Sequence, residues 1–199
     1  MDTIYQFTEP YTFLEQEYTE VDFGGLLKLT GRDLHEALLL ANKIEKDFLE
    51  PEGMTFFFHL AERASGTGAA FFEDLPGLVG EEMRVFLLDL LGEAADRKEI
   101  KDVDPDAVTA RVLADARRAT KKMGEASAIS VAACQYSAMT GVKVGDIMDG
   151  SAADAYQIYL RVSIVFFVMR AKQEKARAEK AAREISSCET SEGSSPTLA

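Results

Sequence analysis

The chain has 199 residues, of which 47% are hydrophobic and 28% are charged, and its formal net charge at pH 7 is −12. This composition is typical of a soluble globular protein with one core or two small ones. The charge argues against nucleic acids and anionic membrane surfaces as partners, because proteins that bind them need a basic face.

The N-terminal residues are expected to form an antiparallel β-hairpin. Residues 1–23 are rich in Tyr, Phe, Thr, Val and Ile, and Thr19–Phe23 alternates between apolar or hydroxyl side chains and acidic ones. The segment Leu14–Glu17 is the expected tip, and Pro10 marks an interruption or an edge position in the first strand. Gly24 and its neighbour Gly25 end the second strand.

Three helices are expected to follow the hairpin. The first starts at Thr30, whose hydroxyl can accept from the amide of Asp33, and its apolar positions recur at helical spacing from Leu34 to Phe48. The second covers about residues 54–65 and stops at Gly66, and the third covers about residues 80–91.

The second half of the chain repeats this order weakly. When Gly66 is aligned with Gly141, Ser65 falls on Thr140 and Phe72 falls on Ile147. Asp104 is expected to cap the first helix of the second unit, with Pro105 at its first position.

The predicted class is therefore α+β and mainly α, with an N-terminal hairpin, two three-helix units and a long protruding C-terminal helix. The predicted organisation is a hairpin plus three-helix domain at 1–92, a charged linker at 93–103, a second three-helix unit at 104–170, an extended charged helix at 171–185 and a disordered tail at 186–199.

The apolar window Ile158–Met169 is expected to be a buried helix. It is about half as long as the roughly 20 residues needed to span a bilayer, and it carries Arg161. The N-terminus MDTIYQFTEP also lacks the basic and apolar regions of a signal peptide. We therefore expect no association with a membrane.

The sequence motifs that could bind a cofactor or a metal ion are incomplete. The segment Gly66–Phe71 lacks the third glycine of a dinucleotide-binding loop, and Asp102–Asp106 lacks the glycine and terminal glutamate of a calcium loop. Cys134 lies in a helical stretch and Cys188 in a serine-rich tail, which suits a reducing cytosol. The residue types that could hold a metal do not have ligand spacing, so we expect no metal and no cofactor.

No catalytic residue is expected either. His35 and His59 lie in helices without a nucleophile beside them in sequence. The acidic pairs Glu73/Asp74 and Glu81/Glu82 could supply acid–base chemistry, but carboxylates near a helix N-terminus are also favoured by the helix dipole. The chain is interpreted as a protein that is not an enzyme.

The predicted partner-binding surface consists of two apolar stretches, residues 38–40 on the first expected helix and residues 56–58 on the second. Three consecutive phenylalanines spread over about 200° of a helix, so a single contact with the core cannot cover all of them. They indicate either a helix enclosed on two sides or a surface open to a partner. The predicted surface residues are Leu38, Leu39, Leu40, Phe56, Phe57 and Phe58.

Over residues 3–92, the order of short motifs resembles the tail assembly chaperones of bacteriophages and prophages. The matching residues are the TGRDL signature Thr30, Gly31, Arg32, Asp33 and Leu34, the ASG signature Ala64, Ser65 and Gly66, and the turn residues Leu75 and Pro76. The hairpin tip departs from the family pattern, because Glu15 and Gln16 replace a turn that contains glycine.

This resemblance implies a non-catalytic chaperone of the bacterial host cytoplasm that is absent from the mature virion. It would bind the tape-measure protein, and tail-tube protein is a further candidate partner, during tail assembly. A homo-oligomer is compatible with this role, and the second unit is either a frameshift-type extension or a duplicated domain. The alternatives are a structural virion component, such as a tail completion or head–tail joining protein, and a helical adaptor unrelated to phage.

Overall fold

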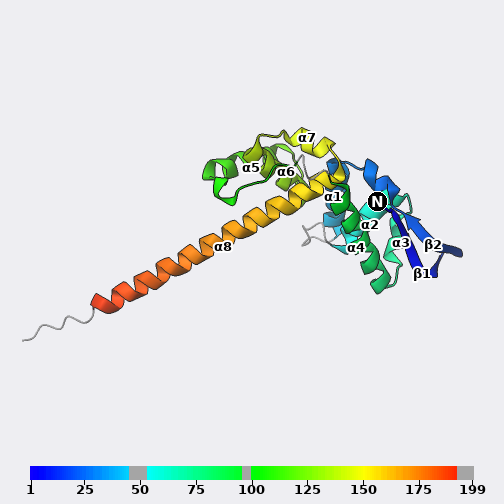
Figure 1. Cartoon of the computed structure of the whole chain (residues 1–199), viewed down its shortest axis with the longest axis horizontal. Helices are drawn as coiled ribbons and strands as arrows, with labels where there is room; N and C mark the ends of the chain where they lie inside the picture. The colour runs from blue at the N-terminus through cyan, green and yellow to red at the C-terminus, as the bar shows by residue number, and fades with distance from the viewer. Residues whose placement is uncertain (45–52, 96–99, 192–199) are drawn as a thin grey trace, which may run out of the picture.

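Figure 1 shows a computed structural model of the chain, in which residues 1–44, 53–95 and 100–191 are described. An N-terminal hairpin is followed by helices, and a long C-terminal helix projects from the body, so the predicted α+β, mainly α class is confirmed. The elements are β1 (Ile4–Phe13), β2 (Gln16–Asp22), the 3-10 helix η1 (Gly24–Lys28), α1 (Gly31–Ile44), α2 (Met54–Ser65), α3 (Ala69–Glu73), α4 (Gly77–Ala94), the 3-10 helix η2 (Pro105–Ala107), α5 (Ala110–Lys122), α6 (Ala128–Thr140), α7 (Val144–Asp149) and α8 (Ala152–Ser191).

The hairpin has a tighter turn than predicted. Leu14 and Glu15 alone connect the strands, and both have a positive φ, 48° and 64°, as a two-residue hairpin turn requires. The pairing of β1 with β2 shifts register between Gln6 and Tyr11, around Pro10, because proline cannot donate to the ladder. The predicted interruption of the first strand is therefore confirmed.

The helix signals of the first half are largely confirmed. The carboxylate of Asp33 accepts from the backbone amide of Thr30 at 2.8 Å and from its hydroxyl at 2.7 Å, which fixes the start of α1. The bounds of α2 agree with the prediction, and Gly66 ends it with a φ of 76°. However, α3 was not predicted, and α4 begins at Gly77, earlier than expected.

In the second half, the predicted cap forms a different structure. Asp104 accepts from the amide of Asp106 at 2.8 Å, but this bond closes only the short turn η2. The helix α5 begins at Ala110, capped by the hydroxyl of Thr109.

The ends of α2 and α6, and the starts of the two helices that follow each of them, fit the repeat register. The helices α2 and α6 end at Ser65 and Thr140, and each is followed by a glycine with positive φ. The hydroxyls of Ser65 and Thr140 both donate to the carbonyl four residues earlier, at 2.8 Å. The helices α3 and α7, and then α4 and α8, also begin at equivalent positions.

One hydrophobic core runs through both halves of the chain. Its buried members extend from Val21 on β2 to Val162 on α8, and α1 packs against α2, α6, α7 and α8. The starts of α1 and α8 also pair directly: the amide of Gly31 donates to the carbonyl of Gly150 at 3.1 Å, and the amide of Ala152 donates to the carbonyl of Leu29 at 2.8 Å. We call this pairing the cap joint.

Some predicted features lie outside the described residues. They are the end of the first apolar stripe at Phe48, residues 96–99 of the predicted linker, and residues 192–199 of the predicted tail. Within the described part, α8 continues to Ser191, beyond the predicted end of the charged helix at residue 185.

Candidate interaction surface

Three of the six predicted partner-binding residues lie in the core. Leu38 and Phe56 are 1% exposed and Phe57 is 2% exposed, so the prediction that they form a surface is wrong. The reason is that α1 and α2 are covered on two sides, α2 by α3, α4 and the hairpin and α1 by the second half of the chain. Leu39 is partly buried.

The remaining two predicted surface residues differ from each other. Phe58 is partly buried and packs against the core. Leu40 is 39% exposed, but the large apolar residues of α1 before it point inward. Of the two alternatives for the phenylalanine run, the structure therefore shows the helix enclosed on two sides.

The TGRD residues form the cap joint, which is a structural feature. A Cβ at Gly31 would lie 3.0 Å from the Cβ of Ala155 and 3.0 Å from the carbonyl oxygen of Ile147, so the close approach of α1 to the second half requires glycine. Arg32 forms an ion pair with Asp149 across the same joint.

Arg63 of α2 holds the N-terminal turn of α1 on the side away from the cap joint. Its guanidinium donates to Asp33 at 3.2 Å and to Glu36 at 3.1 Å, and so ties α2 to α1. Capping by Thr30 and the ion pair with Arg63 lower the pKa of Asp33, although burial opposes this as the largest single effect. Ser65 and Gly66 end α2. Structural roles are therefore found for Thr30, Gly31, Arg32, Asp33, Ser65 and Gly66.

An exposed apolar face lies on α8, which the sequence reasoning did not select. Ile164 is 63% exposed and Phe167 is 74% exposed, while Val162 and Val165 on the opposite side of the helix are buried. A shallow pocket of about 310 Å³ lies next to Ile164, and Val103 forms part of its wall. Large apolar side chains that stay exposed together indicate a surface for a partner.

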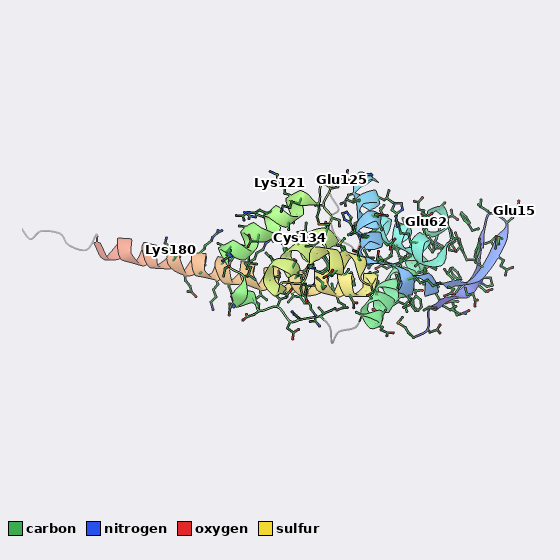
Figure 2. The ribbon with its side chains drawn as sticks, turned by 90° about the horizontal axis from the view of Figure 1, so that it is seen from above. Glu15, Glu62, Lys121, Glu125, Cys134 and Lys180 are labelled. Carbon is green, nitrogen blue, oxygen red and sulfur yellow. The ribbon has the colours of Figure 1, made fainter. Side chains whose placement is uncertain are left out.

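The same face of α8 continues along the part that leaves the body, where it carries three alanines and one glutamate. From Ile164 and Phe167, the alternating steps of four and three residues lead to Ala171, Glu174, Ala178 and Ala181, all exposed. We call these six residues the α8 seam. Figure 2 shows that Lys180 lies on this projecting part of the helix, far from Cys134 in the body. The spacing is that of a helix that packs along another helix.

Cationic side chains flank the seam. Arg170, Lys175 and Arg177 are exposed, and they occupy the positions next to the seam that lie beside a partner helix in a coiled coil. The two halves of the chain also differ in charge. Residues 1–95 carry 19 acidic and 6 basic side chains, a net charge of −13, and residues 96–199 carry 15 acidic and 16 basic side chains, a net charge of +1.

The described residues contain no group of three or more His, Cys, Asp or Glu side chains that could hold a metal ion. The Nδ1 atom of His35 lies 2.8 Å from the hydroxyl of Ser127, the residue that caps α6, so this imidazole connects two helices. Cys134 is buried, and burial raises the pKa of its thiol.

Within the described part of the chain, the segment Ala152–Ala181 of α8 has the length and composition of a membrane-spanning helix. The core helix of a water-soluble protein passes the same criterion, and Ala152, Ile158 and Val162 are buried against the body. We therefore describe α8 as a core helix that continues beyond the body.

Comparisons with known proteins found no relative. No protein-family model matches the chain, and neither the curated proteins nor the solved structures contain a match.

Proposed function

We propose that the chain is a non-catalytic tail assembly chaperone of a bacteriophage or prophage that binds the tape-measure protein through the α8 seam. The proposal combines the resemblance of residues 3–92 to that family with one structural observation: Ile164 and Phe167 stay exposed on a helix that projects from the body. A chaperone for a long helical protein needs such a face, because it must cover the apolar stripe of its partner before that stripe self-associates.

The charges around the seam define the partner further. Arg170, Lys175 and Arg177 would repel the same residues of a second α8, so pairing of two copies along this face is disfavoured. The proposed occupant is an amphipathic helix of the tape-measure protein whose apolar stripe is flanked by Asp or Glu. Tail-tube protein is a further candidate partner in this proposal, and the complex forms in the cytoplasm of the bacterial host.

The test is co-expression of the tagged chain with a tape-measure protein, followed by capture and quantification of that partner. We expect Phe167→Glu and Ile164→Glu each to reduce capture, because burial of one such side chain contributes about 1.5–3 kcal/mol, or roughly 10- to 100-fold in Kd. Both side chains are exposed, so the variants keep the fold, which circular dichroism and thermal unfolding can verify.

Leu78→Glu is the matched control, because Leu78 lies on α4 and is 75% exposed. Capture that survives both α8 substitutions, or that falls equally with the control, would contradict the proposal. Mass spectrometry of purified phage particles separates it from the alternative of a structural virion component. A chaperone is absent from the mature particle, whereas a tail completion or joining protein is present in it.

A further inference from the structure

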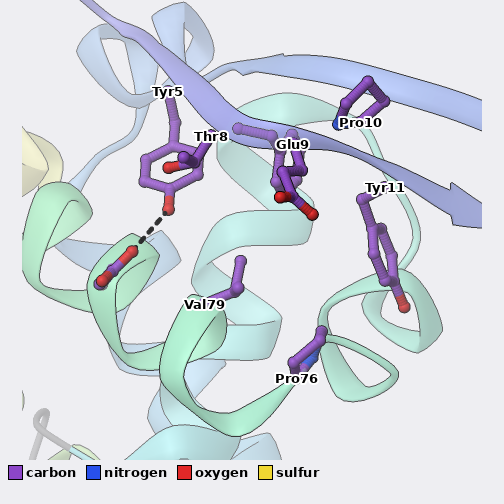
Figure 3. A pocket seen from close by; sticks show the side chains of 9 residues that line it. Tyr5, Thr8, Glu9, Pro10, Tyr11, Pro76 and Val79 are labelled. Atoms are coloured by element: carbon purple, nitrogen blue, oxygen red, sulfur yellow. Dashed lines mark hydrogen bonds between the residues drawn. The ribbon is translucent and has the colours of Figure 1, made fainter.

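A second candidate site lies at the opposite end of the body, between β1 and the start of α4. It is a pocket of about 310 Å³. Figure 3 shows Tyr5 and Tyr11 at its two ends, with Pro76 and Val79 on the helix side facing the strand. Phe7 also lines the pocket, and its ring lies 5.4 Å from that of Tyr5 and 5.9 Å from that of Tyr11. The rings therefore form a nearly continuous aromatic wall.

A carboxylate interrupts this aromatic row. Tyr5, Phe7, Tyr11 and Phe13 of β1 are aromatic and partly buried. Glu9 lies between Phe7 and Tyr11 in the sequence, and Figure 3 places it over the pocket between Tyr5 and Tyr11. Glu82 on α4 supplies a second carboxylate, 3.4 Å from the Tyr5 hydroxyl. Among the described residues that line the pocket, none is Lys or Arg.

Hydrogen bonds fix the two tyrosines. The Tyr11 hydroxyl donates to the carboxylate of Asp74 at 2.6 Å and approaches the Asp74 carbonyl oxygen at 2.8 Å. Burial and then the bond to Asp74 raise the pKa of Tyr11 to about 12, so the phenol is neutral and donates. The ring edges of Tyr11 and Phe7 are also held against Phe71, at ring distances of 5.6 and 6.4 Å. The aromatic side chains of the wall are therefore held in place by contacts within the chain, without a ligand.

We propose that this pocket binds a lysine or arginine side chain carried by an extended segment of a partner polypeptide. Aromatic faces attract a cation, and the carboxylates of Glu9 and Glu82 on opposite sides complement its charge. The aliphatic stem of such a side chain packs against Val79 and Pro76. An apolar occupant would instead desolvate both carboxylates without supplying a cation to pair with them, and an anionic one would be repelled.

The shape of the pocket favours an extended segment. The pocket follows β1 from Tyr5 to Tyr11, and residues 7–10 of this strand fall in the interval where the register with β2 is interrupted. A peptide laid along the strand would present alternate side chains to the pocket, as in recognition at a sheet edge. This inference stands independently of the function proposed for the α8 seam.

The test uses two blocked peptides that differ in one side chain, Gly-Val-Lys-Val-Gly and the same peptide with norleucine in place of lysine. Each is titrated into the full chain while the tyrosine ring signals are followed by NMR. We expect the lysine peptide to shift the Tyr5 and Tyr11 signals saturably and to bind about tenfold more tightly than the norleucine peptide. An arginine peptide should behave like the lysine peptide.

Two double variants with the same net charge complete the design. Glu9→Gln with Glu82→Gln should weaken the lysine peptide about fivefold, because both complementary charges are lost. Asp89→Asn with Glu93→Asn removes two exposed charges farther along α4 and should leave the affinity unchanged. All four carboxylates are exposed, so both variants should fold, as their thermal unfolding will show.

Three results would overturn the proposal. They are equal affinity for the norleucine peptide, an equal loss in the two double variants, and an absence of saturable shifts at Tyr5 and Tyr11. The last result includes the case in which only Tyr156 or Tyr159, in the second half of the chain, responds.

Discussion

At the scale of single residues, the cap joint depends on a glycine. The Cβ of any other residue at position 31 would meet backbone atoms of α7, including the Cα of Met148 at 3.1 Å, and backbone cannot move aside as a flexible side chain can. Gly31 is also buried. The residue is needed for close packing between two parts of the chain that are far apart in sequence.

We expect Gly31→Ala to destabilise the protein by about 1–3 kcal/mol, the usual cost of overpacking a filled site. Gly77→Ala is the matched control, because a Cβ at Gly77, the first residue of α4, has no atom within 4 Å. The control should be neutral or slightly stabilising, since alanine restricts the unfolded chain. Urea unfolding of both variants measures the difference, and equal effects would show that the joint tolerates a methyl group.

His35 makes stability depend on pH. Burial lowers its pKa from 6.5, although Glu36 and Glu125 oppose the shift and Arg32 adds to it. The unfolded chain therefore takes up a proton at a higher pH than the folded chain does. The contribution of His35 to stability is complete above about pH 6.5 and is lost as the pH falls from there through the lower folded-state pKa.

We therefore expect the Tm to fall between about pH 7.5 and pH 5.5, and His35→Gln to reduce this fall. Glutamine can still bond to Ser127, so the contact between α1 and α6 is kept while the titration is removed. His59→Gln, which leaves His35 in place, is the control. A fall of the same size in the His35 variant would assign the pH dependence to other groups.

At the scale of elements, the sequence predicted the helix starts and ends that depend on interactions within a single helix turn. Thr30 with Asp33, and Gly66, act within one helix turn, and the starts and ends that they predict are found in the structure. Asp104 was interpreted as a helix cap, but a side chain that binds an amide two residues later closes a 3-10 turn equally well. The short helix α3 has too few residues for a helical period to be recognised.

The projecting part of α8 is expected to contribute little to the stability of the body. Residues 170–181 are all exposed, and Lys172 is joined to Asp106 of the body by an exposed ion pair at 2.7 Å. A chain that stops after Met169 should keep its Tm within about 3 °C, since an exposed ion pair contributes at most about 1 kcal/mol. Calorimetry tests this, and a larger decrease would reveal packing of the arm on the body.

At the scale of the whole molecule, exposure could not be read from the sequence. Phe56 and Phe57 lie on a helix that two layers enclose, and the second layer comes from remote parts of the chain. Ile164 and Phe167 stand within an apolar run that suggested burial throughout, yet the body covers only the opposite side of α8, where Val162 and Val165 are buried. Periodicity predicts which residues share a face, but tertiary packing decides which face is covered.

The continuous core predicts that both halves unfold together. The six tyrosines report on the two halves separately: Tyr5, Tyr11 and Tyr18 on the first, and Tyr136, Tyr156 and Tyr159 on the second. With fluorotyrosine incorporated, we expect all six native NMR signals to disappear at the same urea concentration. Earlier loss of the second set would indicate that the α5–α8 half is a separate cooperative unit.

The cap joint also sets an order of events during synthesis. Leu29 and Gly31 are made early, but the groups that they bond, Ala152 and Gly150, leave the ribosome about 120 residues later. Until then the start of α1 has no β-bridge partner, and the helices α6, α7 and α8 that pack against α1 have not been made. The nascent chain must therefore carry an unfinished, apolar N-terminal half through much of translation, and it completes its fold only when α8 emerges.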